Sequence, residues 1–265
     1  MMHHRQILIL PLFFLACSGV QTRLPVDGPQ TAEDVLARAL ARPLPKSAQG
    51  MTRLEAYVKK ERRSVDMIVQ LQMPNAAQMQ AVSPTLDMLA VMATDGKRFV
   101  SFERGGQRCF TGEACPLNMA RLLPIALSPE QLVPALLGRP PLLKSAQQVL
   151  QWDSERNAYV VLLGEVTGTH QQVYVSPQDF RFLGTVMYEK DERVASMEYV
   201  GAGKIPETLR YKAKDVDVTV SLRKVDLDLP VDVEVFAPAC PDGMLQQELP
   251  CVPPAPDVQG KQKSP

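Results

Sequence analysis

The sequence predicts a mainly β protein with a few short helices, organised as one domain. Apolar and polar residues alternate with a period of two along most of the chain, which is typical of strands with one face in water. Prolines number 23 in 265 residues, about 9% against an average near 5%, which favours many strand ends over a helical bundle. Without the N-terminal segment and a loose tail, about 230 residues remain, enough for one large β domain.

The N-terminal segment has the three parts of a secretory signal. Arg5 precedes an apolar run from Ile7 to Ala16, and a small residue stands before Cys17. The run is too short to span a membrane as a helix, which needs about 20 residues. The letters FLAC resemble a bacterial lipobox, which implies cleavage before Cys17 and acylation of that cysteine; an ordinary secretory signal with a chance cysteine is the alternative. We expect residues 1–16 to be a lipoprotein signal peptide and residues 17–30 a lipidated tether.

The first half of the domain is predicted to be one helix followed by strands. Thr31 is an expected N-cap, and the apolar residues at helical spacing after it stop at Pro43, which predicts a helix of about ten residues. The period then changes to two, and turn signals such as Asp95-Gly96 separate the runs. Strands are expected at residues 52–58, 65–73, 86–94, 97–103 and 108–110.

Helical spacing returns in the middle of the chain. Residues 118–123 predict one short turn, and Ser128 with Pro129 at the first helical position predicts a second helix that ends at Gly138. Alternation then resumes in short segments separated by polar turns, which predicts an antiparallel meander. Its strands are expected at residues 149–152, 159–163, 172–175, 182–188, 193–200 and 208–212.

The last long strand contains a shift in its alternation. Apolar residues occupy even positions in residues 216–222 but odd positions in residues 225–229. One residue must therefore be absorbed near Arg223-Lys224, and we expect a β-bulge there. Residues 230–238 carry a further alternating piece, and residues 252–265 are proline-rich, polar and expected to be disordered.

Four cysteines besides Cys17 occur in two groups in the sequence. Cys109 lies near Cys115, and Cys240 lies near Cys251. An even number at short separations in an exported chain predicts disulfides. We expect two local bridges, each contributing about 2 to 3 kcal/mol by the chain-entropy relation. A metal site is the alternative, but it needs further ligands at the right spacing, and the sequence places none nearby.

Several segments together resemble the LolA/LolB superfamily of lipoprotein carriers. They are the Asp95-Gly96 turn after an apolar strand, the segment from Thr111-Gly112 to NMARLLPIALSPEQLVPALLG, and the ending LPVDVEVFAP. The resemblance covers residues 31–238 and points to a lipoprotein branch more than to the soluble carrier. It implies an incomplete antiparallel β-barrel curled around short helices, with an apolar cavity for acyl chains. Residues 31–251 are then expected to form a single LolA/LolB-like domain.

A partly empty interior is also expected from the residues themselves. The sheet has one face of Val, Leu and Met to cover, and the helices expected at residues 31–42 and 116–138 are too few and short to fill a closed barrel of this length. The methionines suit an adaptable lipid pocket, or they merely fill an irregular core. The expected cavity-lining residues are Met67, Val69, Leu71, Met73, Leu89, Val91, Val218 and Val220.

Two features of the family have no clear counterpart in the sequence. The soluble carrier has an arginine inside its cavity, and no motif assigns Arg53, Arg98 or Arg121 to that role. The membrane-anchored acceptor has a protruding apolar loop, for which residues 74–84 are a candidate. An ordinary strand connection is the alternative for these residues.

The sequence contains no recognisable catalytic constellation. It has no GxSxG, phosphate-loop or HExxH motif, and His170, the one histidine left after signal cleavage, is expected to face solvent. Asp215, Asp217, Asp226 and Asp228 recur at alternate positions, which indicates a solvated face rather than a weak calcium site. Charge is balanced, with 29 basic and 29 acidic residues, so the composition gives no indication of a nucleic-acid partner, which would need a basic face. We expect neither catalysis nor a cofactor.

The function that these observations predict is passive hydrophobic binding at the cell envelope. We expect a monomeric lipoprotein that holds or transfers acylated cargo, a lipoprotein or a lipid, in an apolar cavity. Ser18 after the lipidated cysteine, in place of a retention aspartate, implies the outer membrane, facing the periplasm. A structural or sensory envelope lipoprotein that uses the same fold to dock a protein is the alternative.

Overall fold

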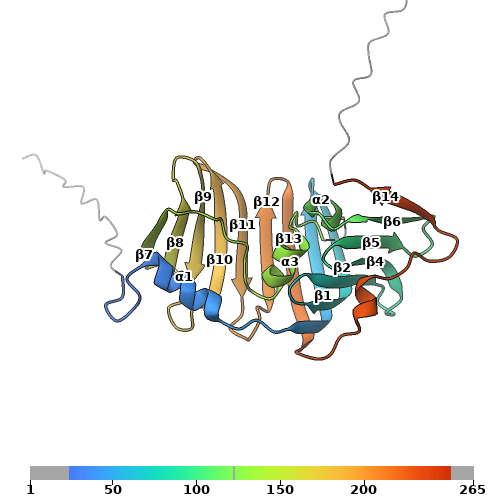
Figure 1. Ribbon diagram of the computed structural model, residues 1–265, viewed down its shortest axis with the longest axis horizontal. Helices are drawn as coiled ribbons and strands as arrows, with labels where there is room; N and C mark the ends of the chain where they lie inside the picture. The colour runs from blue at the N-terminus through green and yellow to red at the C-terminus, as the bar shows by residue number, and fades with distance from the viewer. Residues whose placement is uncertain (1–23, 122, 252–265) are drawn as a thin grey trace, which may run out of the picture.

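The computed structural model describes residues 24–121 and 123–251, and the predicted signal peptide, Cys17 and the proline-rich tail lie outside these ranges. The described residues form one large sheet and a few helices (Figure 1). The helices are α1 (Ala32–Ala41), α2 (Pro116–Met119), α3 (Pro129–Leu136) and the 3₁₀ helix η1 (Val233–Phe236). The strands are β1 (Ser47–Val58), β2 (Glu61–Gln72), β3 (Ala76–Val82), β4 (Met88–Thr94), β5 (Arg98–Glu103), β6 (Arg108–Glu113), β7 (Gln148–Asp153), β8 (Ala158–Gly164), β9 (Thr169–Val175), β10 (Phe182–Glu189), β11 (Glu192–Val200), β12 (Thr208–Ala213), β13 (Val216–Leu227) and β14 (Leu245–Leu249).

The sheet is open, with β14 at one edge and β7 at the other. Its 14 strands follow the order β14-β6-β5-β4-β3-β2-β1-β13-β12-β11-β10-β9-β8-β7. Neighbours pair antiparallel except β14, which runs parallel to β6. The prediction of a mainly β fold and an incomplete antiparallel barrel is therefore confirmed. Helix α1 lies against β7 and β8, and α3 lies against β3. We call the face that these helices cover the inner face.

One continuous apolar core joins the two halves of the sheet. Helix α1 contributes Val35 and Leu36, which are buried against inner-face residues of β8 to β10 such as Val161. Helix α3 contributes Leu132 and Val133 to the same cluster. Burial of this inner face stabilises α1 in particular, because an isolated helix of ten residues is marginal in water.

The pairing of β1 with β13 confirms the predicted bulge. Met51 faces Lys224 and Thr52 faces Leu222, so Arg223 has no partner on β1. The extra residue keeps Val220 and Val225 both directed at the core. Antiparallel neighbours flank this pair, β2 beside β1 and β12 beside β13.

The structure corrects the prediction in two segments rich in proline or polar residues. Residues 74–84 were expected to be a loop, either a protruding apolar one or an ordinary strand connection, but β3 occupies most of them and pairs with β2 and β4. The alternating piece expected at residues 230–238 is instead η1, whose first turn is capped by the Asp232 side chain accepting from the Glu234 backbone N–H at 3.0 Å. An aspartate with prolines nearby favours a capped turn over hydrogen-bonded pairing as a β-strand.

Part of the expected tether packs on the domain. Residues 24–30 form a turn in which the Gln30 side chain donates to the carbonyl of Pro25 at 2.9 Å. Leu24 packs against the core, and Gly28 lies against Tyr159, where an added Cβ would lie 1.9 Å from the hydroxyl oxygen. The folded part therefore begins before Thr31.

The disulfides join the middle of the chain to its end, so the predicted local pairing is wrong. Cys109 bonds to Cys240 and Cys115 bonds to Cys251, with Cα atoms 5.8 and 6.0 Å apart. Both pairs fix residues 229–251, which we call the strap. Sequence proximity misled the prediction, because β14 adds to the free edge of β6 and brings the distant cysteines alongside.

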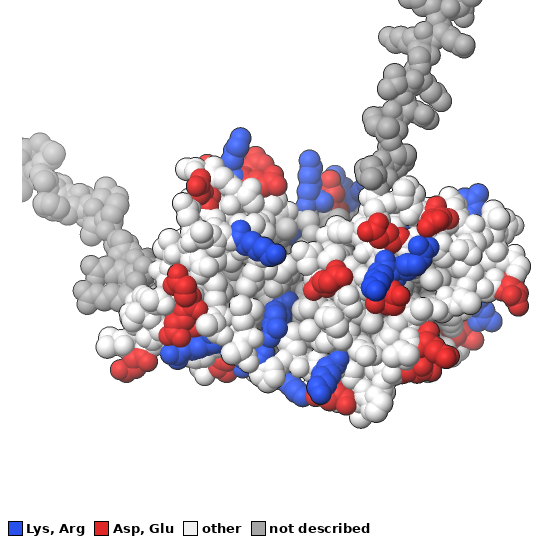
Figure 2. All heavy atoms as spheres, in the orientation of Figure 1, with Lys and Arg blue, Asp and Glu red and all other residues white. Residues whose placement is uncertain are grey.

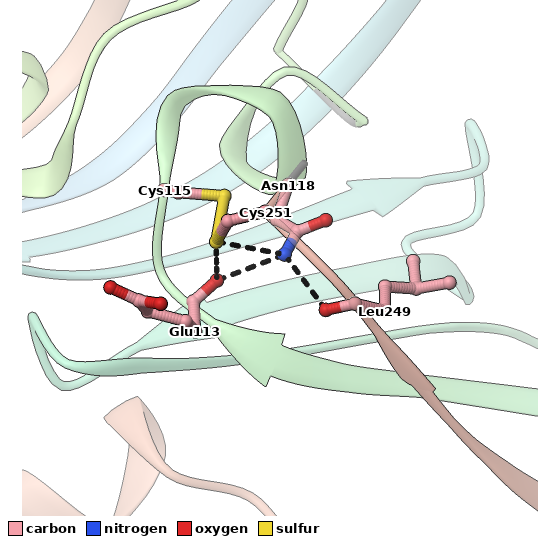
Figure 3. Close-up of a disulfide and its surroundings, with 5 residues drawn as sticks. All are labelled: Glu113, Cys115, Asn118, Leu249 and Cys251. Carbon is pink, nitrogen blue, oxygen red and sulfur yellow. Dashed lines mark hydrogen bonds between the residues drawn. A yellow bond between two sulfur atoms is a disulfide. The ribbon is translucent and has the colours of Figure 1, made fainter. Parts of the chain in front are cut away.

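The strap crosses the outer face of β3 to β6 before it joins the edge. The buried Gln78 side chain donates to the carbonyl of Val235 at 2.8 Å, and Val91, Phe102 and Cys109 form a small outer cluster under Cys240 and Met244. At its far end the Asn118 side chain donates to the carbonyls of Glu113 at 2.9 Å and Leu249 at 3.4 Å, beside the second disulfide (Figure 3).

Candidate functional site: an apolar interior under a helical cover

The candidate site lies between the inner face of β1, β2, β3 and β13 and a segment that covers it. We call residues 123–138, which include α3, the cover. Alternation on the strands places residues such as Thr52, Met67 and Val220 on the inner face, and α3 directs Leu132 and Leu136 at them. The two surfaces meet through side chains that are almost all aliphatic.

Local sequence signals set where α3 begins and ends. Ser128 and Gln131 form a capping box, and Pro129 occupies the first turn, where its missing N–H is not needed. Gly138 follows the helix with φ of 100°, a left-handed conformation that glycine adopts without strain. These signals were readable in the sequence, and the prediction for this helix is confirmed.

A small cavity remains where the cover meets the sheet. The volume open to the centre of a water molecule is ≈ 10 Å³, room for about one water. Thr52 lies on its wall, and the hydroxyl of this residue is buried and has no hydrogen-bond partner within the described residues. The cavity is lined by Thr52, Met67, Val69, Leu71, Met79, Leu123, Leu136, Val220 and Leu222.

The structure brings four of the eight predicted lining residues to this cavity, namely Met67, Val69, Leu71 and Val220. Val218 is buried in the same core, and Met73 packs at its margin. The remaining two are corrections: Leu89 is 45% exposed, and Val91 belongs to the outer cluster. Residues 86–94 are apolar on both faces, and the pairing of Met92 with Met79 directs Met92, not Val91, to the inner face.

Sequence reasoning missed the partners that the cover and β3 supply. Met79, Leu123 and Leu136 line the cavity, and Leu222 closes it beside the bulge. Leu136 lies in the helix predicted between Ser128 and Gly138, but no sequence signal shows which strands a helix covers. Met79 was missed because β3 was taken for a connection.

An open groove continues the inner face beyond the cover. It lies over β4 to β6, with a volume of ≈ 590 Å³ on the measure used above, and is lined by side chains of both charges, including Glu103 and Arg108. Arg121 packs over the Phe110 ring, 4.2 Å from its centroid, at the end of the groove nearest α2. The groove is thus polar where the cavity is apolar.

None of the three arginines considered from the sequence lines the apolar cavity. Arg53 pairs with Asp66 at 3.0 Å, on the face opposite Thr52. Arg98 pairs with Glu248 of β14 at 3.3 Å, and Arg121 borders the groove instead.

The prediction that His170 faces solvent is wrong. The residue is 5% exposed and stacks on Tyr188, with ring centroids 4.8 Å apart. Its neighbours on β8 and β10 are Gly164 and Tyr188. His170 Nδ1 has no hydrogen-bond partner within the described residues. The histidine is therefore part of the packed sheet and lies away from the cavity.

Two of the four aspartates considered from the sequence pair with lysines. Asp217 pairs with Lys212 at 2.9 Å, and Asp228 pairs with Lys204. The hydrogen bond from Lys204, and then that from the Lys46 backbone N–H, hold the pKa of Asp228 below its usual value. The described ranges contain no group of three or more His, Cys, Asp or Glu side chains arranged to hold a metal ion.

The protruding turn lies later than predicted, between β3 and β4. Residues 83–87 are held by the Ser83, Thr85 and Asp87 side chains, with Thr85 Oγ1 donating to Asp87 at 2.7 Å. Leu86 is 62% exposed and has φ of 65°, a left-handed conformation that is unfavourable for leucine. The turn therefore holds an apolar side chain in water.

Charges are dispersed on the face shown in Figure 2, where basic and acidic side chains are interspersed among wide uncharged areas. None of the helices within residues 24–251 has the length and apolar character needed to cross a bilayer.

Comparison with solved structures identifies the fold. A LolA superfamily protein from Nitrosomonas europaea, NE2245, aligns over 79% of this chain and 99% of its own with a TM-score of 0.50 and 10% identity. The chain has the LolA-type fold. A DUF1329 family protein from Desulfovibrio piger aligns over 77% of this chain and 95% of its own, also with a TM-score of 0.50 and 10% identity. No protein-family model and no curated protein matches the sequence.

Proposed function

We propose that this chain is a cell-envelope lipoprotein that holds or passes on acylated cargo, with the acyl chain between the sheet and the cover. The observation that carries the proposal is an interior built from aliphatic side chains on a LolA-type fold. Such a site binds by hydrophobic transfer, which yields roughly 2.5 kcal/mol for each 100 Å² of acyl surface buried. It requires no catalytic group.

Binding requires the cover to move, because ligand sites have volumes of roughly 300 to 1,000 Å³ and the cavity holds about one water. Within residues 123–138 the one hydrogen bond to the sheet is that from Asn75 Nδ2 to Glu130 Oε1, at 3.2 Å. An acyl chain that enters replaces aliphatic contacts between Leu136 and the sheet by equivalent contacts of its own. The apolar side chains of the cover therefore stay buried, against the acyl chain instead of the sheet, and moving the cover costs little hydrophobic free energy.

The anchor proposed for this function is Cys17. One acyl chain binds a membrane only marginally, whereas two or three hold a protein there stably, at about 0.8 kcal/mol for each buried methylene. We propose that lipidation of Cys17 places the domain at the outer membrane, facing the periplasm, with residues 18–23 between lipid and domain. Mass spectrometry of the envelope protein tests the modification; an unmodified Cys17 would contradict it.

The binding test uses a palmitoylated peptide and the same peptide without the acyl chain. The acylated peptide alone should bind to the full secreted chain, and native mass spectrometry should show one peptide per protein. Val69→Phe, which fills the cavity, should weaken binding tenfold or more. Val149→Phe is the matched control, because Val149 is exposed on the edge strand β7 and away from the cavity.

Equal affinity of the two peptides would overturn the proposal, and so would unchanged binding by Val69→Phe. Should Val69→Phe fail to fold, a diazirine in the acyl chain replaces it, and crosslinks should fall on Met67, Met79 and Leu123. Lipid extraction after capture from the envelope tests the alternative function: a stoichiometric protein partner without bound acyl chains would favour a docking protein.

A further inference from the structure

A second pocket lies where the C-terminal ends of α1 and α3 meet the loop after β11. Its volume is ≈ 40 Å³ on the same measure, room for about three water-sized groups. Its floor is apolar, formed by Leu137, Phe182 and Ile205 with the ring of Tyr199. The loop from Gly201 to Pro206 forms its rim and brings Lys204 to the opening.

Four cationic side chains line this pocket, and two carboxylates pair with them. Arg42 and Arg181 share one partner, Asp179, each at 3.0 Å. Lys204 pairs with Asp228. Arg139 is bound to neutral groups, since its Nη2 donates to the carbonyls of Leu40 and Arg42 at 2.9 and 2.8 Å. The pocket therefore carries an excess of positive charge.

Two of these cations have donors to spare. The Nε atom of Arg181 is buried and has no hydrogen-bond partner within the described residues. Within the described residues, Arg42 donates through Nη1 alone, to the carboxylate and the backbone carbonyl of Asp179. Burial lowers the pKa of Arg139, which agrees with a positive charge held partly out of water. Buried N–H donors are normally paired, and an orphaned one indicates a missing acceptor.

We propose that this pocket binds an oxyanion, a phosphate or carboxylate group, either free or as the head group of an amphiphile. The guanidinium fork donates two parallel hydrogen bonds to such groups, and this geometry favours them over chloride. The site is separate from the apolar cavity, because Leu137 faces the pocket while the adjacent Leu136 faces the cavity. Anion binding at this pocket therefore does not depend on acyl binding in the cavity.

The test is isothermal titration calorimetry of the full secreted chain with four probes: inorganic phosphate, decyl phosphate, decanoate and uncharged decyl maltoside. If inorganic phosphate binds, a free anion is sufficient for binding to the pocket. If only decyl phosphate and decanoate bind, the pocket takes the head group of an amphiphile. In either case Arg181→Gln should lower the affinity for the anion tenfold or more, because a charge-assisted hydrogen bond is lost. Arg210→Gln is the matched control, an exposed arginine with one ion pair, and should stay within twofold of wild type.

The outcomes separate this proposal from acyl binding in the cavity. Val69→Phe should leave phosphate affinity unchanged, and Arg181→Gln should leave decyl maltoside binding unchanged. Should Arg181→Gln fail to fold, Arg42→Gln carries the test. The proposal is overturned if no anionic probe binds the wild type, if decyl maltoside competes equally with decyl phosphate, or if the arginine variants bind anions as the wild type does.

Discussion

Removing the disulfides one at a time should show that they constrain the chain jointly. Each bridge closes a large loop, with sequence separations of 131 and 136 residues. When one bridge is removed, the other still holds the strap, and the constraint lost is a ring of about 19 residues, worth about 3 kcal/mol in the chain-entropy relation. Removing the second bridge then releases the large loop, worth about 5 kcal/mol.

The variants are Cys109→Ala/Cys240→Ala, Cys115→Ala/Cys251→Ala and their combination. Urea unfolding followed by circular dichroism should give a loss of about 3 kcal/mol for each pair and about 8 kcal/mol for both. Local bridges, as expected from the sequence, would instead give about 2 to 3 kcal/mol each and an additive total near 5 kcal/mol. Additive losses of that size would refute the crossed pairing and the joint constraint.

Digestion with a glutamate-specific protease under non-reducing conditions checks the pairing directly. The four cysteines fall in four separate peptides, because the protease cleaves after Glu103, Glu113, Glu130, Glu234 and Glu248. The crossed pairing links peptide 104–113 to 235–248, and peptide 114–130 to 249–265. Local pairing would link 104–113 to 114–130, which gives a different mass.

Three further predictions concern the acyl site, the β3–β4 turn and the acid limit of stability. Each methylene added to an acylated peptide should strengthen binding about fourfold, from roughly 0.8 kcal/mol per buried CH₂, and competition between chain lengths measures this; a flat dependence would exclude the cavity. Leu86→Asn should raise the free energy of unfolding by about 1 kcal/mol, because asparagine tolerates the left-handed conformation; destabilisation in urea would show that Leu86 is packed. The pKa of Asp228 is lowered by Lys204, so its contribution is present above about pH 4 and is lost as pH falls through the folded-state pKa. The stability difference between wild type and Asp228→Asn should therefore shrink on acidification, and a constant difference would contradict the pairing.

The sequence predicted those elements whose signals are local. The N-cap at Thr31, the capping box at Ser128 and the turn at Asp95-Gly96 each fix backbone geometry within a few residues. The bulge at Arg223 was predictable for a different reason, because a change of phase in a two-residue period has few physical solutions.

Features that depend on contacts distant in sequence were not predictable. The partner of Cys109 is decided by which strand edge the strap reaches, and five residues of β14 carry no strong strand signal of their own. The same limit applies to Leu89 and Val91, where a run apolar on both faces conceals which face is inner. His170 was misplaced because its polar neighbours in sequence suggested solvent, whereas its stacking partner, Tyr188, lies on the adjacent strand β10.

The hydrogen bonds and disulfides are distributed unevenly between the two walls of the cavity. Their distribution indicates which wall would move if the proposed ligand bound. In the sheet wall, each strand is hydrogen-bonded to the next from β14 to β7, and the two disulfides fix the strap on the outer side of the sheet. The cover lies on the opposite side and is held by aliphatic contacts and the Asn75–Glu130 hydrogen bond, which is exposed and contributes only about 1 kcal/mol. Because an acyl chain can replace the aliphatic contacts, the cover is the part whose displacement costs least. In the function proposed above, the sheet is therefore the fixed wall and the cover is the wall that an acyl chain displaces.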